Sequence, residues 1–170
     1  MKRQLATLVG LLLVAVLGTK AQVNITLVDK VNPTDEMFID MAVTAAQTSV
    51  DDGGMACGAV VILNGAWRST GRATASQTAE EAAIAKSRLK SLDNATIYTV
   101  NEPTTAALNA IAKAGGTKVV FANSRSDVMR AGIYSESDYD SAALADGVAE
   151  QVEMVQLLYH PASTLISKQR

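Results

Sequence analysis

A single cysteine and a single histidine limit the metal and nucleophile chemistry open to this chain of 170 residues. Cys57 and His160 cannot by themselves supply the three or four Cys and His ligands of a zinc site, and one cysteine forms no intramolecular disulfide. A thiol activated by imidazole needs the two side chains to meet, but Cys57 lies in a valine-rich apolar run and His160 stands beside Pro161 with no orienting group. We therefore expect Cys57 to be a buried, unreactive thiol.

A carboxylate at a predicted helix start is the best candidate for moving a proton. Thr78 and Glu81 match the S/T-x-x-E capping box, which predicts a helix over residues 78–89. Glu80 lies in the first turn of that helix, where the helix dipole stabilises a carboxylate by ~0.3–1 kcal/mol. Its position therefore has a structural explanation beside the chemical one.

Two hydroxyls stand at the start of a later predicted helix. Pro103 takes a first-turn position, and Thr104 and Thr105 follow it. The amide groups of such a turn, together with the hydroxyl of Thr78, could cradle an anion or a polar ligand. A first turn that is only solvated or packed explains the same residues, and both interpretations stay open at this point.

The elements that must position these residues follow from the apolar pattern. Asn64-Gly65 is a strong two-residue hairpin signal between an apolar run over residues 57–63 and a return strand over 66–73. The later elements, in chain order, are a helix over residues 78–89, a strand over 95–100, a helix over 103–114, a strand over 117–122, a helical turn over 127–130 and a helical tail over 141–169.

The first helix is expected to begin at Asn32-Pro33 and to end at the aspartates and glycines over residues 51–54. Helical spacing predicts a buried stripe on it, which consists of Met37, Met41 and Ala45 with Phe38 and Ala42 beside them. Methionines at this spacing are typical of core packing.

The order of elements predicts the fold class. Each strand after the hairpin is separated from the next by a helix of the length that a parallel crossover needs. The sequence therefore predicts an α/β protein, a three-layer α/β/α sandwich with a mixed sheet. We expect a signal peptide over residues 1–21, a lead-in segment over 22–34 and one domain over 35–170 that includes the helical C-terminal tail.

Composition excludes several classes of function. With 48% hydrophobic and 19% charged residues, the chain is too apolar to be disordered and long enough for one domain. Its 15 Lys and Arg against 17 Asp and Glu give a formal charge of -2, and no basic run follows residue 3. Nucleic acid is therefore not expected as a partner.

The N-terminus has the pattern of a signal peptide. Lys2 and Arg3 precede an uncharged apolar stretch of about 13 residues, short of the ~20 that a spanning helix needs, and small residues precede an expected cleavage after Ala21. Removing this segment also removes Lys20 and leaves 12 basic against 17 acidic residues, a charge of -5. We expect a secreted or periplasmic protein with no membrane partner after cleavage.

Four blocks in order resemble the cytidine-deaminase-fold nucleobase and nucleoside deaminases, and guanine deaminases most of all. Residues 53–61 (GGMACGAVV) resemble the G-G-x-P-F-G-A-V-V strand of that family, and residues 69–73 (STGRA) resemble more weakly its x-x-G-R-N. Residues 78–80 (TAE) fall at its H-A-E, and residues 102–111 (EPTTAALNAI) at its E-P-C-P-M-C-x-G-A-I. The similarity runs over residues 35–158 and implies the cytidine deaminase-like fold.

In that family, a His and two Cys hold a zinc ion, and the Glu of H-A-E shuttles a proton. By the resemblance, the ligand positions are Thr78, Thr104 and Ala107, so all three zinc ligands are replaced. Glu80 is the remnant proton shuttle, and Ala73 stands where the family has a base-contacting Asn. We expect no metal cofactor, and a roomier pocket built by these residues and Cys57.

The resemblance leaves three functions to weigh. The first is an exported deaminase-fold protein that has lost zinc-dependent deamination and binds a purine-like or other small polar ligand or a protein partner. The second is an active nucleobase or nucleoside deaminase that uses Glu80. The third is a structural module without a small ligand. The resemblance also implies a homodimer, with residues 154–158 packing on the partner.

Overall fold

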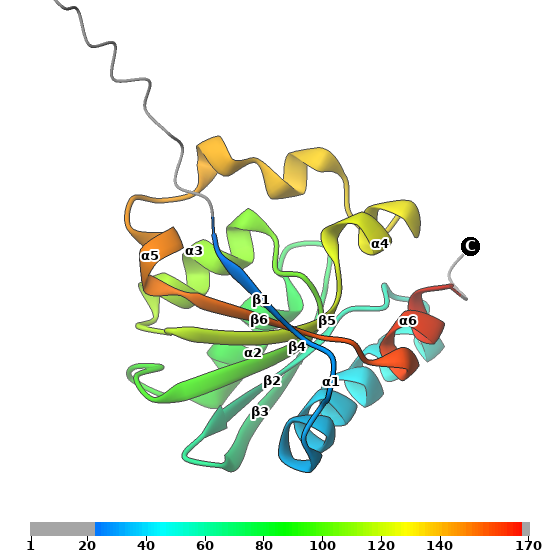
Figure 1. The fold of residues 1–170 in the computed structure, drawn as a ribbon. Helices are drawn as coiled ribbons and strands as arrows, with labels where there is room; N and C mark the ends of the chain where they lie inside the picture. The colour runs from blue at the N-terminus through cyan, green and yellow to red at the C-terminus, as the bar shows by residue number, and fades with distance from the viewer. Residues whose placement is uncertain (1–22, 168–170) are drawn as a thin grey trace, which may run out of the picture.

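The computed structural model describes residues 23–167, which fold around a six-stranded mixed sheet. The strands, shown as arrows in Figure 1, are β1 (Ile25–Val28), β2 (Gly58–Leu63), β3 (Ala66–Arg72), β4 (Ala95–Asn101), β5 (Lys118–Asn123) and β6 (Glu153–Leu157). Their order across the sheet is β1-β6-β5-β4-β2-β3. β2 is antiparallel to both β3 and β4, whereas β4, β5, β6 and β1 run parallel.

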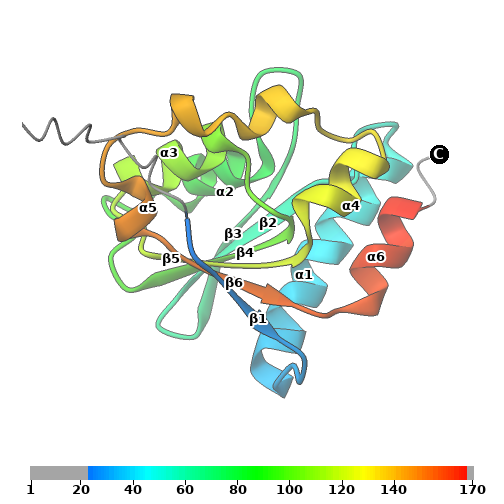
Figure 2. The ribbon, with the colours of Figure 1, turned by 45° about the horizontal axis from the view of Figure 1, so that its top comes forward.

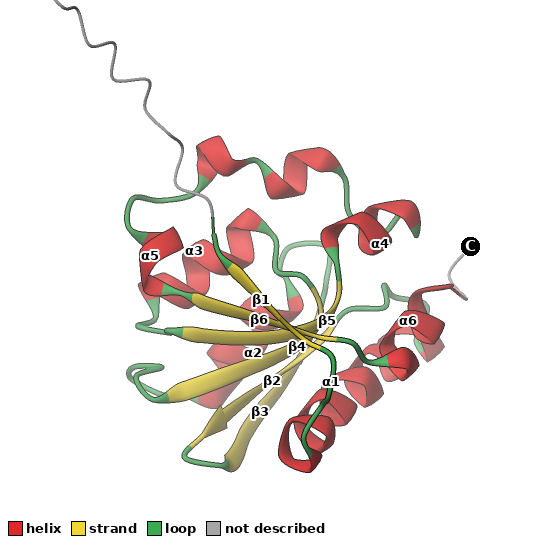
Figure 3. Cartoon of the chain, in the orientation of Figure 1, coloured by secondary structure: helices red, strands yellow, loops and turns green. Residues whose placement is uncertain are grey.

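Helices cover both faces of the sheet, which confirms the predicted α/β sandwich (Figure 3). They are α1 (Pro33–Asp51), α2 (Ala79–Ser87), α3 (Thr105–Lys113), α4 (Arg125–Arg130), α5 (Val148–Gln151) and α6 (His160–Ser167), with short 3-10 helices η1 (Glu136–Tyr139) and η2 (Ser141–Ala143). Helices α1 and α6 pack together on one face, and α2 and α3 pack together on the other. Within residues 23–167, no helix has the length and apolar character needed to cross a membrane.

Local signals begin and end these elements where the sequence predicts. Asn64 and Gly65 both have positive φ, 52° and 74°, as a tight hairpin between β2 and β3 requires. Asn32 caps α1 by accepting hydrogen bonds from the backbone N–H groups of Thr34 and Asp35.

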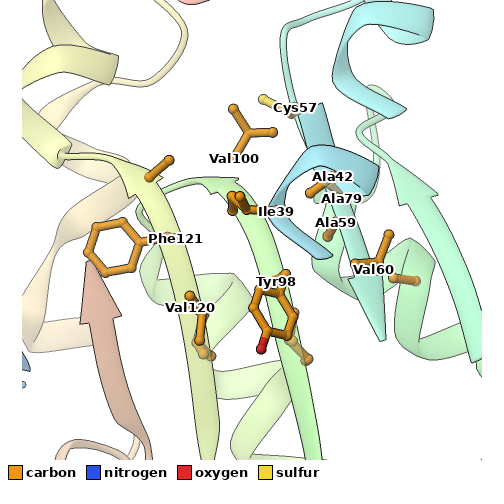
Figure 4. Close-up of a cluster of buried hydrophobic side chains, with 14 of the residues drawn as sticks. Ile39, Ala42, Cys57, Ala59, Val60, Ala79, Tyr98, Val100, Val120 and Phe121 are labelled. Carbon is orange, nitrogen blue, oxygen red and sulfur yellow. The ribbon is translucent and has the colours of Figure 1, made fainter. Parts of the chain in front are cut away.

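The buried core covers both faces of the sheet, with residues of α1 on one face and residues of α2 and α3 on the other. Figure 4 shows Ile39 and Ala42 of α1 against Val100 and Phe121 of the sheet, with Cys57 at one end of this cluster. The predicted stripe of α1 is wrong at Met37, which is 52% exposed, whereas its other members are buried or, for Met41, packed partly buried against the core. The buried residues of the helix are Phe38, Ile39, Ala42, Ala45, Ala46 and Ser49. The buried face is therefore turned from Met37 toward its neighbour Phe38, whose ring packs on Tyr98 of β4 at 5.2 Å between centroids.

The predicted helical tail is wrong at residues 153–157, which form strand β6, whereas η2, α5 and α6 within the same tail are helical. This strand lies between β5 and β1, and Met154, Val155 and Leu157 are buried within the sheet. A short apolar run covered on both faces has no alternation, so periodicity does not separate it from a helix. The residues expected to pack on a partner thus belong to the sheet of the same chain, and the homodimer stays a prediction.

The N-terminal part of the chain also differs from its predicted lead-in. Residues 25–28 of that segment form β1 and pair with β6 in parallel register, Ile25 opposite Met154 and Val28 opposite Leu157. The sheet of the domain therefore begins before residue 35. The expected signal peptide, residues 1–21, lies outside the described residues.

Candidate functional site

The carboxyl of Glu80 lies in the interior of the protein, between α2 and the sheet. Thr78 caps α2 by accepting from the N–H of Glu81, whose side chain accepts from the N–H of Thr78, so the predicted capping box is present. The helix approaches the sheet at Gly71, where a Cβ would lie 2.1 Å from the carbonyl oxygen of Ala79. This close approach leaves Glu80 only 4% exposed.

Thr99 of β4 is the hydrogen-bond partner of Glu80. Its Oγ1 lies 2.5 Å from Oε1 of Glu80 and 3.3 Å from the carbonyl oxygen of Gly58. A hydroxyl has one hydrogen to donate, so a protonated Glu80 that donates to Thr99 leaves Thr99 free to donate to Gly58. Burial also raises the pKa of Glu80, while hydrogen bonds from Thr99 and Thr78 act in the opposite direction.

Cys57 lies just before β2 and faces the same interior. Asn101 Nδ2 donates to the carbonyl oxygen of Ala56 at 2.9 Å and to Sγ of Cys57 at 3.4 Å, and the hydroxyl of Tyr134 forms a further hydrogen bond with the thiol. Burial, reinforced by the nearby carboxyl of Glu80, raises the pKa of Cys57 to about 11. The thiol is therefore neutral at pH 7, as expected for an unreactive cysteine.

The later pair of predicted site residues lies at the start of α3. Thr104 is the N-cap of this helix, and its hydroxyl accepts from the N–H of Ala107 at 3.2 Å. Both residues are buried, at 4% and 0% exposure. Ala73 follows β3, and its N–H donates to the carbonyl oxygen of Cys57 at 3.5 Å. His160 is exposed at the start of α6, whereas the side-chain partners of Cys57 are Asn101 and Tyr134.

Two tyrosines belong to the site although the sequence analysis did not name them. Tyr134 and Tyr139 contact each other edge to face, with ring centroids 6.1 Å apart. The chain has four tyrosines, and two of them fall five residues apart in a segment of serines and acids. In a chain with 4% aromatic residues, this concentration was the available signal.

Asparagines at the carboxyl ends of β4 and β5 complete the buried polar groups around the site. Asn123 Nδ2 donates to Oδ1 of Asn101 at 3.0 Å and to the carbonyl oxygen of Ala162 at 3.2 Å. Through Asn101, this network reaches the thiol of Cys57 and fixes the end of the sheet against α6. Sequence reasoning missed both residues, because their pairing depends on the parallel register of the two strands.

A cavity of about 820 Å³ lies beside the candidate site, toward the β1 edge of the sheet. Its wall includes Glu102, Arg125, Tyr139, Leu108, Ile25 and Met154. Burial raises the pKa of Glu102, and the charge of Arg125 acts in the opposite direction. None of the predicted pocket residues lines this cavity, whose volume is in the range typical of ligand sites.

This arrangement of α2 and α3 on a mixed sheet is that of a cytidine deaminase-like protein. Guanine deaminase from Nitrosomonas europaea is similar to the chain with a TM-score of 0.68 and 16% identity, over 84% of this chain and 86% of that one. Guanine deaminase from Bacillus subtilis is 31% identical over 62% of this chain and 73% of that one, with a TM-score of 0.57. NE0047 in complex with 2,6-diaminopurine is similar with a TM-score of 0.68 and 16% identity, over 82% and 83% of the two chains.

No protein-family model and no curated protein matches the sequence. The structural similarity and the identity to the Bacillus subtilis enzyme nevertheless show that the chain belongs to the cytidine-deaminase-fold family, close to its guanine deaminases.

The side chains at the zinc-ligand positions implied by this family do not fit a zinc ion. The hydroxyls of Thr78 and Thr104 accept helix N–H groups, and Ala107 has no donor atom in its side chain. A hydroxyl is also a poor ligand for zinc compared with thiolate or imidazole. In the described part of the chain, no three His, Cys, Asp or Glu side chains gather into a group that could hold a metal ion.

Proposed function

We propose that this protein is a deaminase-fold binding protein that has lost the zinc site and zinc-dependent deamination, and that it binds a small purine-like ring. The observation that carries the proposal is the use of Thr78 and Thr104 as helix caps at positions where the family has zinc ligands. Without a metal, water keeps its high pKa and lacks the activation that a bound zinc ion provides at neutral pH.

The groups that remain in the site suit a neutral heterocycle. Burial raises the pKa of Glu80 and so favours its neutral form, its carboxyl oxygens can accept hydrogen bonds, and the thiol of Cys57 is neutral. The exocyclic and ring nitrogens of a purine offer the complementary donors and acceptors. NE0047 is found in complex with 2,6-diaminopurine, and a mutant of it in complex with 8-azaguanine, which supports a purine-like ligand for this chain too.

Calorimetric titration with 2,6-diaminopurine tests the proposal. We expect saturating heat at one ligand per chain with and without added zinc, no release of ammonia, and weaker binding by Glu80→Gln. Glu81→Gln is the matched control, because glutamine preserves the capping box and the substitution lies one residue away.

Two outcomes would overturn this function. Ammonia release that Glu80→Gln abolishes would show an active deaminase that works through Glu80. Absence of heat for 2,6-diaminopurine, guanine, adenine and cytosine would leave a structural module without a small ligand.

We also propose that the protein is exported and forms a homodimer. Export rests on the sequence pattern of residues 1–21, and the homodimer on similarity to guanine deaminases. A secreted form that begins at residue 22 in mass spectrometry and a dimer mass in light scattering are the expected results. A form that keeps residue 1, or a monomer at high concentration, would contradict them.

A further inference from the structure

Residues 132–147, called the flap below, cross over α3 from α4 to α5. Figure 1 and Figure 2 show this segment as the yellow-to-orange part of the chain that carries η1 and η2. Gly132 and Gly147 bound it, with φ of 73° and 80°, and a Cβ at either position would have no atom within 4 Å. Each end of the flap therefore has a glycine in the left-handed region with open space around it.

The side chain of Tyr134, which belongs to the flap, lies in the candidate site. Its hydroxyl forms a hydrogen bond with the thiol of Cys57, and the carboxyl of Glu80 is close enough to interact with it. Burial raises the pKa of Tyr134, so the phenol stays neutral and keeps its hydrogen for the sulfur. A six-membered ring with a polar substituent thus already faces Cys57 and Glu80.

Tyr139 stands between Tyr134 and the cavity of about 820 Å³. Its ring lines that cavity and contacts the ring of Tyr134. Its hydroxyl donates to the carbonyl oxygen of Glu102 at 3.0 Å, and the guanidinium of Arg125 lies over the ring, 4.9 Å from its centroid. The contacts therefore run from the cavity through Tyr139 and Tyr134 to Cys57.

The rest of the flap is held by side-chain contacts with α3. The hydroxyl of Thr105 donates to the carbonyl oxygen of Asp140 at 3.1 Å. The side chain of Asn109 donates to the carbonyl oxygen of Ala143 at 2.9 Å and accepts from the N–H of Ala145 at 2.9 Å. No strand of the sheet lies within the flap, and most of its residues are exposed. A mostly exposed segment without sheet pairing opens at a lower free-energy cost than global unfolding.

We infer that the flap is a gate, in which the ring of Tyr134 occupies the place of a ring-shaped ligand and must leave before a ligand can contact Glu80. Ligand binding and the contact of Tyr134 with Cys57 then exclude each other. The apparent affinity is reduced by the fraction of molecules in which the gate is open. The identity of the ligand rests on the function proposed above, whereas the closure of the site by Tyr134 does not depend on that function.

Cys57 makes the gate measurable, because it is the only cysteine of the chain. We expect 4,4'-dithiodipyridine to label native Tyr134→Ala ~10-fold or more faster than wild type, since the thiol becomes accessible by local opening alone. Tyr134→Phe keeps the ring and should label far more slowly than Tyr134→Ala. Tyr98→Phe, which loses a hydrogen bond to Asp35 on the other face of the sheet, controls for general destabilisation.

Equal labelling of Tyr134→Ala and wild type would overturn the gate. So would equal acceleration in Tyr98→Phe at the same loss of thermal stability, because labelling would then report global unfolding.

Titration with 2,6-diaminopurine separates the gate from the proposed function. If the gate is right, Tyr134→Ala binds more tightly than wild type, and saturating ligand changes the labelling rate of wild-type Cys57. Weaker binding by Tyr134→Ala would overturn the gate, because Tyr134 would then be a ligand contact. Faster labelling of Tyr134→Ala, with no binding by either protein, supports the gate and contradicts the proposed function.

Discussion

Thr99 and Glu80 form a buried hydrogen bond of 2.5 Å between the central sheet and the first turn of α2. Both side chains are almost fully buried, at 2% and 4% exposure. This pair holds the carboxyl that stands at the glutamate position of the H-A-E motif, and it links the candidate site to the stability of the fold.

Thr99→Val should destabilise the protein by about 1–3 kcal/mol, because valine keeps the shape of threonine but leaves the carboxyl of Glu80 without this partner. Denaturant unfolding measures the change in free energy. Thr96→Val, on the same strand and only half-buried, is the matched control and should stay within about 0.5 kcal/mol of wild type. Equal effects of the two substitutions would contradict a special role for Thr99.

Glu80→Gln should stabilise the protein at pH 8 and lose this advantage near pH 4. The pKa of Glu80 is raised by burial in the folded state above the ordinary value of 4.5, so the folded state binds the proton more tightly than the unfolded state. The contribution of Glu80 to the free energy of unfolding is therefore complete below pH 4.5, and it is lost as the pH rises through the folded-state pKa. Each unit by which the folded-state pKa exceeds the unfolded-state pKa corresponds to about 1.4 kcal/mol of free energy of unfolding.

Unfolding curves of wild type and Glu80→Gln between pH 4 and pH 8 test this linkage. A difference between the two proteins that is the same at every pH would show that the carboxyl is not the cause.

Thr78→Ala and Thr104→Ala should each cost about 1 kcal/mol of stability, because each removes the side-chain acceptor at a helix N-cap. If the hydroxyls act only as caps, this loss is the same with added zinc and with a chelator. Stabilisation of wild type by zinc that either substitution abolishes would instead identify the threonines as metal ligands.

Restoring the motif residues should create the zinc site. The triple variant Thr78→His, Thr104→Cys and Ala107→Cys supplies one imidazole and two thiolates on the first turns of α2 and α3. After dialysis, we expect about one zinc per chain for this variant and none for wild type, measured by elemental analysis. Stoichiometric zinc in the wild-type protein would contradict the loss of the site.

Sequence alone was sufficient where a few neighbouring residues decide the conformation. The capping box at Thr78 and Glu81, the cap at Asn32 and the turn at Asn64-Gly65 all formed as predicted. Their energies come from hydrogen bonds and φ preferences within four residues, so no distant partner can change them much.

Tertiary structure decided the features that depend on residues far apart. Strand β6 exists because β5 and β1 pair with it on both sides, although its apolar run fits a helix equally well. Tyr134 reaches Cys57 across 77 residues only because the flap folds back over α3. Such contacts depend on the packing of the whole chain, so the local sequence could not show that Tyr134 contacts Cys57.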